Sequence, residues 1–276
     1  MSQKVWMITG ASRGFGSEIA KQVLASGDRV IATARNVASL GHLGSYESLF
    51  SVALDVTNEA QVKAAVDAAL QHFGRIDVLV NNAGYGLLGA VEEASSQEIE
   101  NLYRTNVFGL LNVTRAVLPA LRKQRSGHII NMSSVGGYSS MFPGWGIYCS
   151  TKFAVEALSE ALHAELAPLG IHVTVVEPGY FRTDFLDSSS LAHSSQIIAD
   201  YAESAGKMRD LAAGRNHEQP GDPKKLAKAL QQLVNTPEPP LRLPLGADAL
   251  ARIAQKNAFV EAETAKWRNL SVSTDF

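Results

Sequence analysis

The stretch KVWMITGASRGFGSEIAKQVLASG, residues 4–27, decides the fold because it holds a buried strand, a glycine-rich turn and an amphipathic helix in one run. Gly10, Gly14 and Gly16 let the backbone turn sharply and approach a pyrophosphate, whose charge the helix N-terminus then favours. The spacing is GxxxGxG rather than the commoner GxGxxG, so the glycines alone fit a nucleotide loop or a plain strand-to-helix turn equally well. The strand before and the helix after them favour nucleotide binding.

The same alternation of strand and helix continues along the chain. Runs typical of buried strands occupy residues 4–9, 29–34, 49–56, 76–81, 127–133 and 171–177. Amphipathic stretches separate them, such as residues 59–73, which Gly74 closes. The pattern predicts a single-domain α/β fold, a Rossmann-like doubly wound parallel β-sheet with helices on both faces, and ligands beyond the carboxyl ends of the strands.

Length, charge and composition predict the domain organisation and exclude some classes of partner. The 276 residues fit one domain, 1–276, with a cofactor-binding half over about 1–125 and a catalytic and substrate-binding part over about 126–276. A net charge of -2 with interspersed signs offers no basic patch, so we expect no nucleic-acid partner. No run reaches the roughly 18 apolar residues of a membrane helix, and a single cysteine suits a reducing compartment. We therefore expect no membrane association and a cytoplasmic protein.

The end of the second strand indicates which nucleotide binds. An acidic residue there favours NAD, whereas arginine accommodates the extra phosphate of NADP. The strand ends in ATARN, with Arg35 and no carboxylate, and Arg13 in the glycine loop can reach the same side. The sequence thus predicts NADP(H); the alternative is that both arginines are solvated surface residues.

The segment YCSTK places Tyr148 and Lys152 four positions apart, so their side chains share one face of a helix. Bringing a tyrosine pKa from about 10 to near 7 requires roughly 4 kcal/mol, which a unit charge at about 4 Å supplies at an effective dielectric of about 20. The pair therefore predicts an acid–base tyrosine, although on its own it is more often a surface pair.

Seven motifs in order, TGASRGFG, LDVT, NNAG, RTNVFG, INMSSVGG, YCSTK and VEPGYFRT, resemble the short-chain dehydrogenase/reductase family over about residues 4–185. The phrases SSVGG and YCSTKFAVEALSEALHAEL look most like the branch of 17β-hydroxysteroid and retinol dehydrogenases and many bacterial carbonyl reductases. The resemblance implies an NADPH-dependent reduction of a ketone or aldehyde, reversibly. The alternatives are a family member with another reaction, such as epimerisation, and a non-catalytic NADP-binding sensor or scaffold.

The resemblance also implies site residues. The tyrosine of YxxxK transfers the proton, the lysine holds the nicotinamide ribose, the second serine of SS binds the carbonyl oxygen and an asparagine holds a water. The matching residues are Tyr148, Lys152, Ser134 and Asn106. The residues expected to bind the cofactor are Gly10, Ser12, Arg13, Gly14, Phe15, Gly16, Arg35, Asp55, Val56, Asn82, Ala83, Gly84, Tyr148, Lys152, Pro178, Gly179, Phe181 and Thr183.

The substrate pocket is expected to be apolar, which favours a bulky hydrophobic or aromatic carbonyl compound. Its candidate residues are Ser134, Phe142, Trp145, Tyr180 and Phe185, with Tyr85, Leu87 and Leu186 as further candidates. Small polar residues from about 184 to 220 indicate a mobile lid over it. From Ser134 to Tyr148 the chain is one residue longer than is common in the family, which leaves Ser133 as an alternative carbonyl-binding serine.

The remaining expectations concern metals and assembly. The seven histidines show no metal-ligand spacing, so no metal site is expected, and Cys149 has no adjacent base that would make it a nucleophile. A terminal helix is predicted from about Ala247 to Trp267. Its apolar residues, expected to pack on the domain or on a neighbour, are Leu250, Ile253, Ala254, Phe259 and Trp267. The family resemblance implies a homo-oligomer, a dimer or tetramer.

Overall fold

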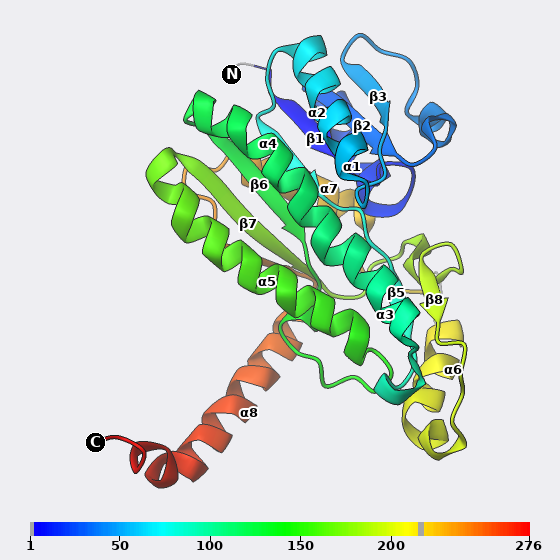
Figure 1. Ribbon diagram of the computed structural model, residues 1–276, viewed down its shortest axis with the longest axis vertical. Helices are drawn as coiled ribbons and strands as arrows, with labels where there is room; N and C mark the ends of the chain where they lie inside the picture. Colours follow the sequence, from blue (N-terminus) through cyan, green and yellow to red (C-terminus); the bar gives the residue numbers. More distant parts are fainter. Residues whose placement is uncertain (1–2, 215–217) are drawn as a thin grey trace.

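A computed structural model describes residues 3–214 and 218–276 and confirms the predicted parallel sheet (Figure 1). Its strands are β1 (Val5–Ile8), β2 (Arg29–Ala34), β3 (Leu49–Ala53), β4 (Val78–Asn81), β6 (Gly127–Met132), β7 (Ile171–Pro178) and β9 (Arg242–Leu245). Their order is β3-β2-β1-β4-β6-β7-β9, and every neighbouring pair is parallel. The order reverses direction at β1, between β2 and β4, which is where doubly wound sheets bind ligands.

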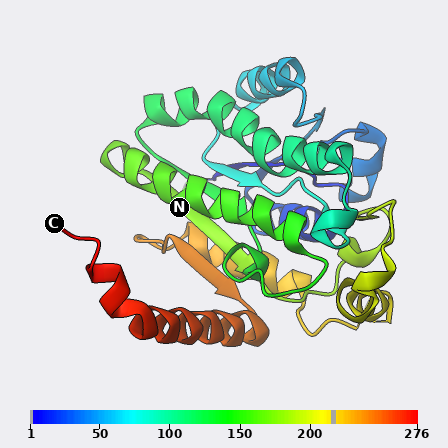
Figure 2. The same ribbon diagram turned by 60° about the horizontal axis from the view of Figure 1, so that its bottom comes forward.

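Helices cover both faces of the sheet because each strand is apolar on both sides. Alternate residues of β1 point in opposite directions: Trp6 and Ile8 join one core, and Val5 and Met7 join the other. The first core is covered by α1 (Gly14–Ala25) and α7 (Pro223–Val234). The second is covered by α2 (Glu59–Phe73), α4 (Leu110–Gln124) and α5 (Gly146–Leu166). In Figure 2, α4 and α5 run side by side over the sheet.

Capping residues set both ends of α2, and Gly74 closes the helix as the sequence predicts. The side chain of Asn58 accepts a hydrogen bond from the Gln61 amide, 3.0 Å away, at the first turn. Gly74 ends the helix with φ of +76°, a left-handed conformation that glycine adopts without steric cost. The helix is thereby held at a fixed length between β3 and β4.

A smaller lobe stands beyond the carboxyl ends of the strands. There β5 (Gly86–Leu88) pairs in parallel with β8 (Leu191–His193), beside α3 (Ser96–Tyr103) and α6 (Lys207–Gly214). Short 3₁₀ turns occupy Val37–Leu43, Val91–Glu93, Val135–Gly137, Ala167–Leu169, Asp184–Leu186 and Ala199–Tyr201, and π-helical turns occupy Arg104–Gly109 and Ala202–Gly206. The predicted lid, 184–220, is therefore largely regular structure, and its residues 215–217 lie outside the described residues.

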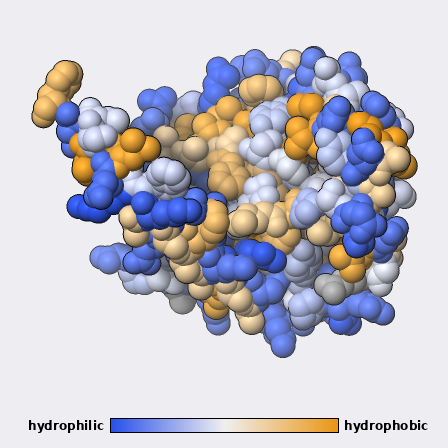
Figure 3. Space-filling model, turned by 90° about the horizontal axis from the view of Figure 1, so that it is seen from below, coloured by the Kyte–Doolittle hydropathy of each residue, from blue (hydrophilic) through white to orange (hydrophobic). Residues whose placement is uncertain are grey.

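The terminal helix α8 (Ala247–Val272) extends five residues beyond the predicted end and projects away from the sheet (Figure 1). Its N-terminal part packs on the domain through the buried Ala249 and the half-buried Ile253, and the Arg252 guanidinium lies 4.3 Å from the centre of the Phe142 ring. Ala254 and the larger Leu250, Phe259 and Trp267 are exposed, so the expected packing on the domain does not form for them. In Figure 3, the projecting α8 at the left presents both hydrophobic and hydrophilic side chains to solvent.

Within the described ranges, none of the helices combines the length and apolar character that a membrane crossing demands.

Candidate active site

A pocket of about 700 Å³ lies at the carboxyl ends of the strands, as the fold predicts. It runs from the glycine-rich loop after β1 to the start of α5. The cofactor candidates among its lining residues are Gly10, Ser12, Arg13, Gly14, Phe15, Arg35, Asp55, Val56, Asn82, Ala83, Gly84, Tyr148, Lys152, Pro178, Gly179, Phe181 and Thr183. Residues from six connections thus converge on one cavity.

Gly16, the remaining cofactor candidate, does not line this pocket. A Cβ atom at Gly16 would collide with the carbonyl of Gly10, so this glycine allows close packing inside the loop. Gly10 and Gly14 have φ of +66° and +54°, and a Cβ on Gly10 would lie 3.0 Å from the Cα of Ala83. The loop therefore needs glycine both for its left-handed turns and for its approach to the strand beside it.

The Asn82 side chain fixes the glycine loop to the end of β4. Its amide nitrogen donates to the carbonyl oxygens of Thr9 and Gly10, at 2.9 and 3.1 Å. In return the Thr9 hydroxyl accepts from the backbone amides of Asn82 and Ala83. Gly14 and Phe15, in the first turn of α1, line the pocket, and the Arg13 side chain makes no cap bond to the amides of that turn. This cradle of backbone amides fits a pyrophosphate.

Arg13 and Arg35 both line the pocket, yet Arg13 is engaged elsewhere. Its Nε donates to the Ser190 hydroxyl at 3.0 Å, and its Nη2 donates to the Ser189 carbonyl. The loop arginine thus reaches across the pocket mouth to the segment that precedes β8. Arg35, directly after β2, is exposed.

The catalytic candidates Ser134, Tyr148 and Lys152 line the pocket together. Ser134 follows β6, and its hydroxyl accepts from the Gly136 amide at 3.0 Å. Tyr148 and Lys152 lie one turn apart on α5, both buried, with the Lys152 Nζ 5.8 Å from the centre of the Tyr148 ring. Nζ donates to the Met132 carbonyl at 2.8 Å.

The pKa of Tyr148 moves opposite to the sequence-based expectation. Burial raises the pKa of the phenol well above its usual value, aided by Cys149 and opposed by a hydrogen bond with Ser134. Burial also lowers the pKa of the Lys152 ammonium to about 8. The prediction that the lysine lowers the tyrosine pKa towards 7 is therefore wrong for this structure, because burial makes the largest contribution to the shift and raises the pKa.

Asn106, the fourth catalytic candidate, lies behind the pocket wall rather than in it. It is in the π-helical turn Arg104–Gly109. Its Oδ1 accepts from the Tyr85 amide at 3.1 Å, and its Nδ2 donates to the Tyr85 carbonyl at 3.0 Å and to the Thr151 hydroxyl at 3.2 Å. Asn106 thereby joins the strand end at β4 to the turn of α5 that carries the catalytic pair.

Aromatic side chains form the wall beside Tyr148. The rings of Trp145 and Phe185 lie 5.7 and 5.5 Å from the Tyr148 ring, and Phe142 also lines the pocket. Tyr180 lines it too, although 45% of this side chain is exposed. The apolar wall predicted from the sequence is present.

Several lining residues were missed by the sequence analysis. They are Asn101, Arg104, Thr105, Met132, Ser188, Ser189, Ser190, Leu191 and Ala192 among others. Residues 188–192 reach the pocket because β8 pairs with β5, a three-residue pairing with no detectable sequence period. Of the further candidates, Tyr85 and Leu186 line the pocket, whereas Leu87 is buried in the adjoining apolar cluster.

Comparisons with curated proteins agree with this geometry. A family model described as short chain dehydrogenase matches residues 4–193. Oxidoreductase BOA17 of Botryotinia fuckeliana is 40% identical, over 98% of this chain and 99% of its own. A 3-ketodihydrosphingosine reductase of Bacteroides thetaiotaomicron is 40% identical over 89% of each chain.

Solved structures share the whole fold. A short-chain dehydrogenase from Streptomyces avermitilis superposes with a TM-score of 0.93 at 42% identity, covering 100% of both chains. A Burkholderia phymatum family member in complex with NAD gives 0.82 at 26% identity, covering 95% of each chain. ElxO with NADP bound gives 0.74 at 28%, covering 91% of this chain and 100% of its own. The neighbours thus bind NAD or NADP, and this chain belongs to the short-chain dehydrogenase/reductase family.

Proposed function

We propose that this oxidoreductase is an NADPH-dependent carbonyl reductase, which converts a bulky hydrophobic or aromatic ketone or aldehyde to the alcohol, reversibly. The observation that carries the proposal is the meeting of Tyr148, Lys152 and Ser134 in one pocket with the glycine-rich loop. The loop amides suit a pyrophosphate, and the strand-end residues suit the rest of a dinucleotide. When bound, the reduced nicotinamide supplies the hydride.

The chain's own groups handle the proton and the developing charge. Tyr148 is kept protonated by burial, which suits a proton donor to the carbonyl oxygen. Ser134 donates to the same oxygen and stabilises the charge that develops on it. The Lys152 ammonium, on the same helix face, stabilises the phenolate that remains after proton transfer.

The preference for NADPH rests on Arg35 and Arg13. No carboxylate stands at the end of β2 to bind the ribose hydroxyls of NAD, and Arg35 is exposed there. Arg13 shares the pocket, and its bonds to the Ser189–Ser190 segment involve one carbonyl and one hydroxyl that solvent can replace. Two charge-assisted bonds favour NADP by roughly two to three orders of magnitude. Arg35→Asp should abolish that preference, read as the ratio of kcat/KM with NADPH and NADH.

The substrate class rests on the aromatic wall. Trp145 and Phe185 pack beside the Tyr148 ring, so a substrate bound at Tyr148 meets aromatic rings rather than charges on this side. The similarity to a protein named 3-ketodihydrosphingosine reductase supports a ketone as the substrate.

The test is loss of reduced-nicotinamide absorbance across aldehydes, aryl ketones and steroid ketones, with NADPH and NADH side by side. Tyr148→Phe should lower kcat at least about 100-fold. Tyr103→Phe is the matched control, because its hydroxyl bonds to Ser150 at 2.9 Å and it does not line the pocket. Tight NADPH binding without turnover on any carbonyl compound would contradict the proposal, as would an unimpaired Tyr148→Phe variant.

A further inference from the structure

A buried carboxylate lies one helical turn beyond the active-site lysine. Glu156 is four residues after Lys152 on α5, so the two side chains share a face of the helix. Both residues are buried, with 4% and 8% of their surface exposed. A buried ionised carboxylate is costly unless other groups compensate its charge, so the partners of Glu156 decide what it does.

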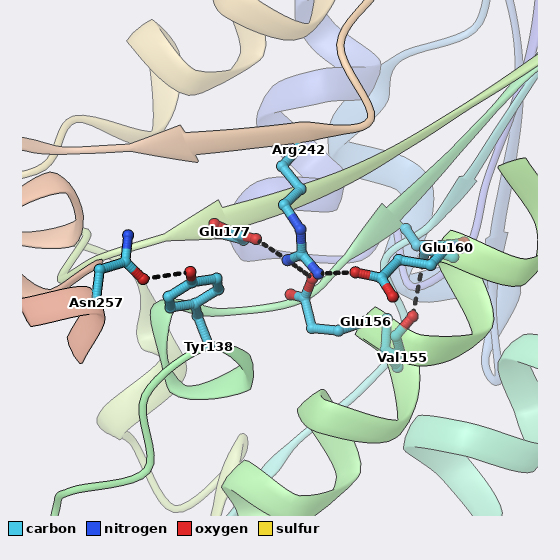
Figure 4. A network of polar contacts seen from close by, with 9 residues as sticks. Tyr138, Val155, Glu156, Glu160, Glu177, Arg242 and Asn257 are labelled. Carbon is cyan, nitrogen blue, oxygen red and sulfur yellow. Dashed lines mark hydrogen bonds and ion pairs between the residues drawn. The ribbon is translucent and has the colours of Figure 1, made fainter. Parts of the chain in front are cut away.

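Arg242, at the start of β9, donates a hydrogen bond to one oxygen of Glu156 (Figure 4). The same Nη1 donates to Glu177 on β7 at 2.6 Å, and Nη2 donates to Glu160 on α5 at 2.5 Å. The Glu177 side chain is 1% exposed and that of Glu160 is 55% exposed. One guanidinium thus serves two buried carboxylates and one solvated carboxylate.

The other oxygen of Glu156 faces the loop that carries the catalytic serine. A Cβ atom added to Gly137 would lie 3.0 Å from Glu156 Oε1, 2.5 Å from the Ser133 hydroxyl and 3.0 Å from the Lys152 carbonyl. The carboxylate oxygen and the hydroxyl have no other partner among the described residues. Glycine at position 137 therefore lets Glu156 approach Ser133, the neighbour of Ser134.

The cluster around Glu156 holds more carboxylates than cations. On α5 it faces Lys152 and Glu160, on β7 it faces Glu177, and on β9 it faces Arg242. Burial and Glu177 raise the pKa of Glu156 to about 7, against Ser133 and Arg242, which lower it. Glu156 in turn raises the pKa of Lys152, which burial lowers to about 8. The ionised form of Glu156 therefore favours the cationic form of Lys152.

We propose that Glu156 is a positioning residue for the active-site lysine: fixed by Arg242, its carboxylate is the counter-ion that keeps Lys152 cationic. This inference rests on the proposed function for its effect on turnover, but the ionisation of the Lys152 amine is measurable without any substrate. Arg242 holds the carboxylate in place, and Ser133 carries the contact to the loop of Ser134.

The experiment titrates the Lys152 amine in the purified full chain. Trace labelling with acetic anhydride from neutral to alkaline pH, read by peptide mass spectrometry, gives the pH at which the amine becomes reactive. Glu156→Gln keeps the side-chain shape and removes the charge, so the Lys152 titration should move to lower pH by roughly one pH unit. The alkaline limb of kcat/KM should move with it. Glu160→Gln, the matched control on the same arginine, should move neither.

A second variant keeps the test decisive if Glu156→Gln does not fold. Glu177→Gln removes the carboxylate that repels Glu156, so Glu156 stays ionised and the Lys152 titration should stay in place or move to higher pH. An unchanged titration in Glu156→Gln, or a drop in Glu177→Gln, would overturn the inference. If the wild type reduces no carbonyl compound, the proposed function fails while the labelling still decides the role of Glu156.

Discussion

Arg209 and Arg242 each bind a buried glutamate, and the pKa values of the two glutamates are shifted in opposite directions. In the small lobe, Arg209 on α6 donates to Glu93 at 2.7 Å, and the Ala90 and Ile198 amides donate to the same carboxylate at 2.7 and 2.9 Å. These bonds lower the pKa of Glu93 to about 2, with the hydrogen bond from Arg209 as the largest contribution. Behind the active site, burial raises the pKa of Glu156 to about 7.

The difference lies in how many donors each carboxylate receives. Glu93 has an arginine of its own and two backbone amides, so its charged form is favoured although the side chain is buried. Glu156 shares Arg242 with Glu177 and Glu160, so the cluster holds more negative than positive charge. The Glu93 cluster joins the lid segment to the loop before α3, whereas the Glu156 cluster is a titratable group behind the pocket.

Arg242→Met should have the largest effect on the free energy of unfolding. The substitution leaves two buried carboxylates without their cation and should cost about 3 to 5 kcal/mol of unfolding free energy at about pH 8. The cost should shrink at about pH 6, because Glu156 then binds a proton. Urea unfolding at both pH values measures it.

The matched variant is Arg209→Met. Its carboxylate keeps two backbone donors, so the loss should be smaller. The loss should also depend less on pH, because the Ala90 and Ile198 amides still favour the ionised form of Glu93. Equal pH dependence in the two variants would contradict the distinction between the clusters.

Glu93→Ala should have the next largest effect. It removes an acceptor from Arg209 and from the Ala90 and Ile198 amides, and it should destabilise the protein by about 3 kcal/mol in urea. Its folded-state pKa lies below the ordinary 4.5, so its contribution is present above about pH 4.5 and is lost as the pH falls through about 2. The control is Glu92→Ala, the exposed neighbour that accepts from Tyr201, where a loss as large as that of Glu93→Ala would refute this account.

The fold was predictable because short segments of the sequence identify each strand and each glycine turn. The glycine loop needs left-handed residues at Gly10 and Gly14, and the Tyr148–Lys152 spacing places both side chains on one helix face. These local patterns also predict the site, because the residues that follow parallel strands meet at one edge of the sheet.

The two arginine clusters were not predictable by the same reasoning. Arg242 and Glu156 are 86 residues apart, and Arg209 and Glu93 are 116 apart, so neither pair leaves a local spacing. The direction of the Tyr148 pKa failed for a related reason, because its burial depends on Trp145 and Phe185, which tertiary packing brings together. Charge spacing along a helix indicates neighbours, but desolvation depends on the whole fold.

Glu156→Gln should change how the free energy of unfolding depends on pH. The folded-state pKa of Glu156 lies above the ordinary 4.5, so its contribution is fully present below about pH 4.5 and is lost as the pH rises through about 7. Removing the titration should flatten that decline by roughly 3 kcal/mol between these limits. Unfolding free energies of wild type and variant over this range measure it, and parallel curves would show that Glu156 does not titrate there.

Tyr138→Phe should have the smallest effect, confined to α8. The Tyr138 hydroxyl donates to Asn257 at 2.5 Å while its ring lies 5.5 Å from the Arg242 guanidinium, so it connects the Arg242 cluster to the terminal helix (Figure 4). Phenylalanine keeps the ring contact and loses the hydrogen bond, which is worth about 0.5 kcal/mol. Amide exchange should quicken around Asn257 while the global Tm stays unchanged. Ser271→Ala, at the far end of α8, loses only a local bond to Trp267 and should leave exchange at Asn257 unaltered. Exchange at Asn257 that is no faster in Tyr138→Phe than in Ser271→Ala would mean that the Tyr138 hydroxyl does not hold α8.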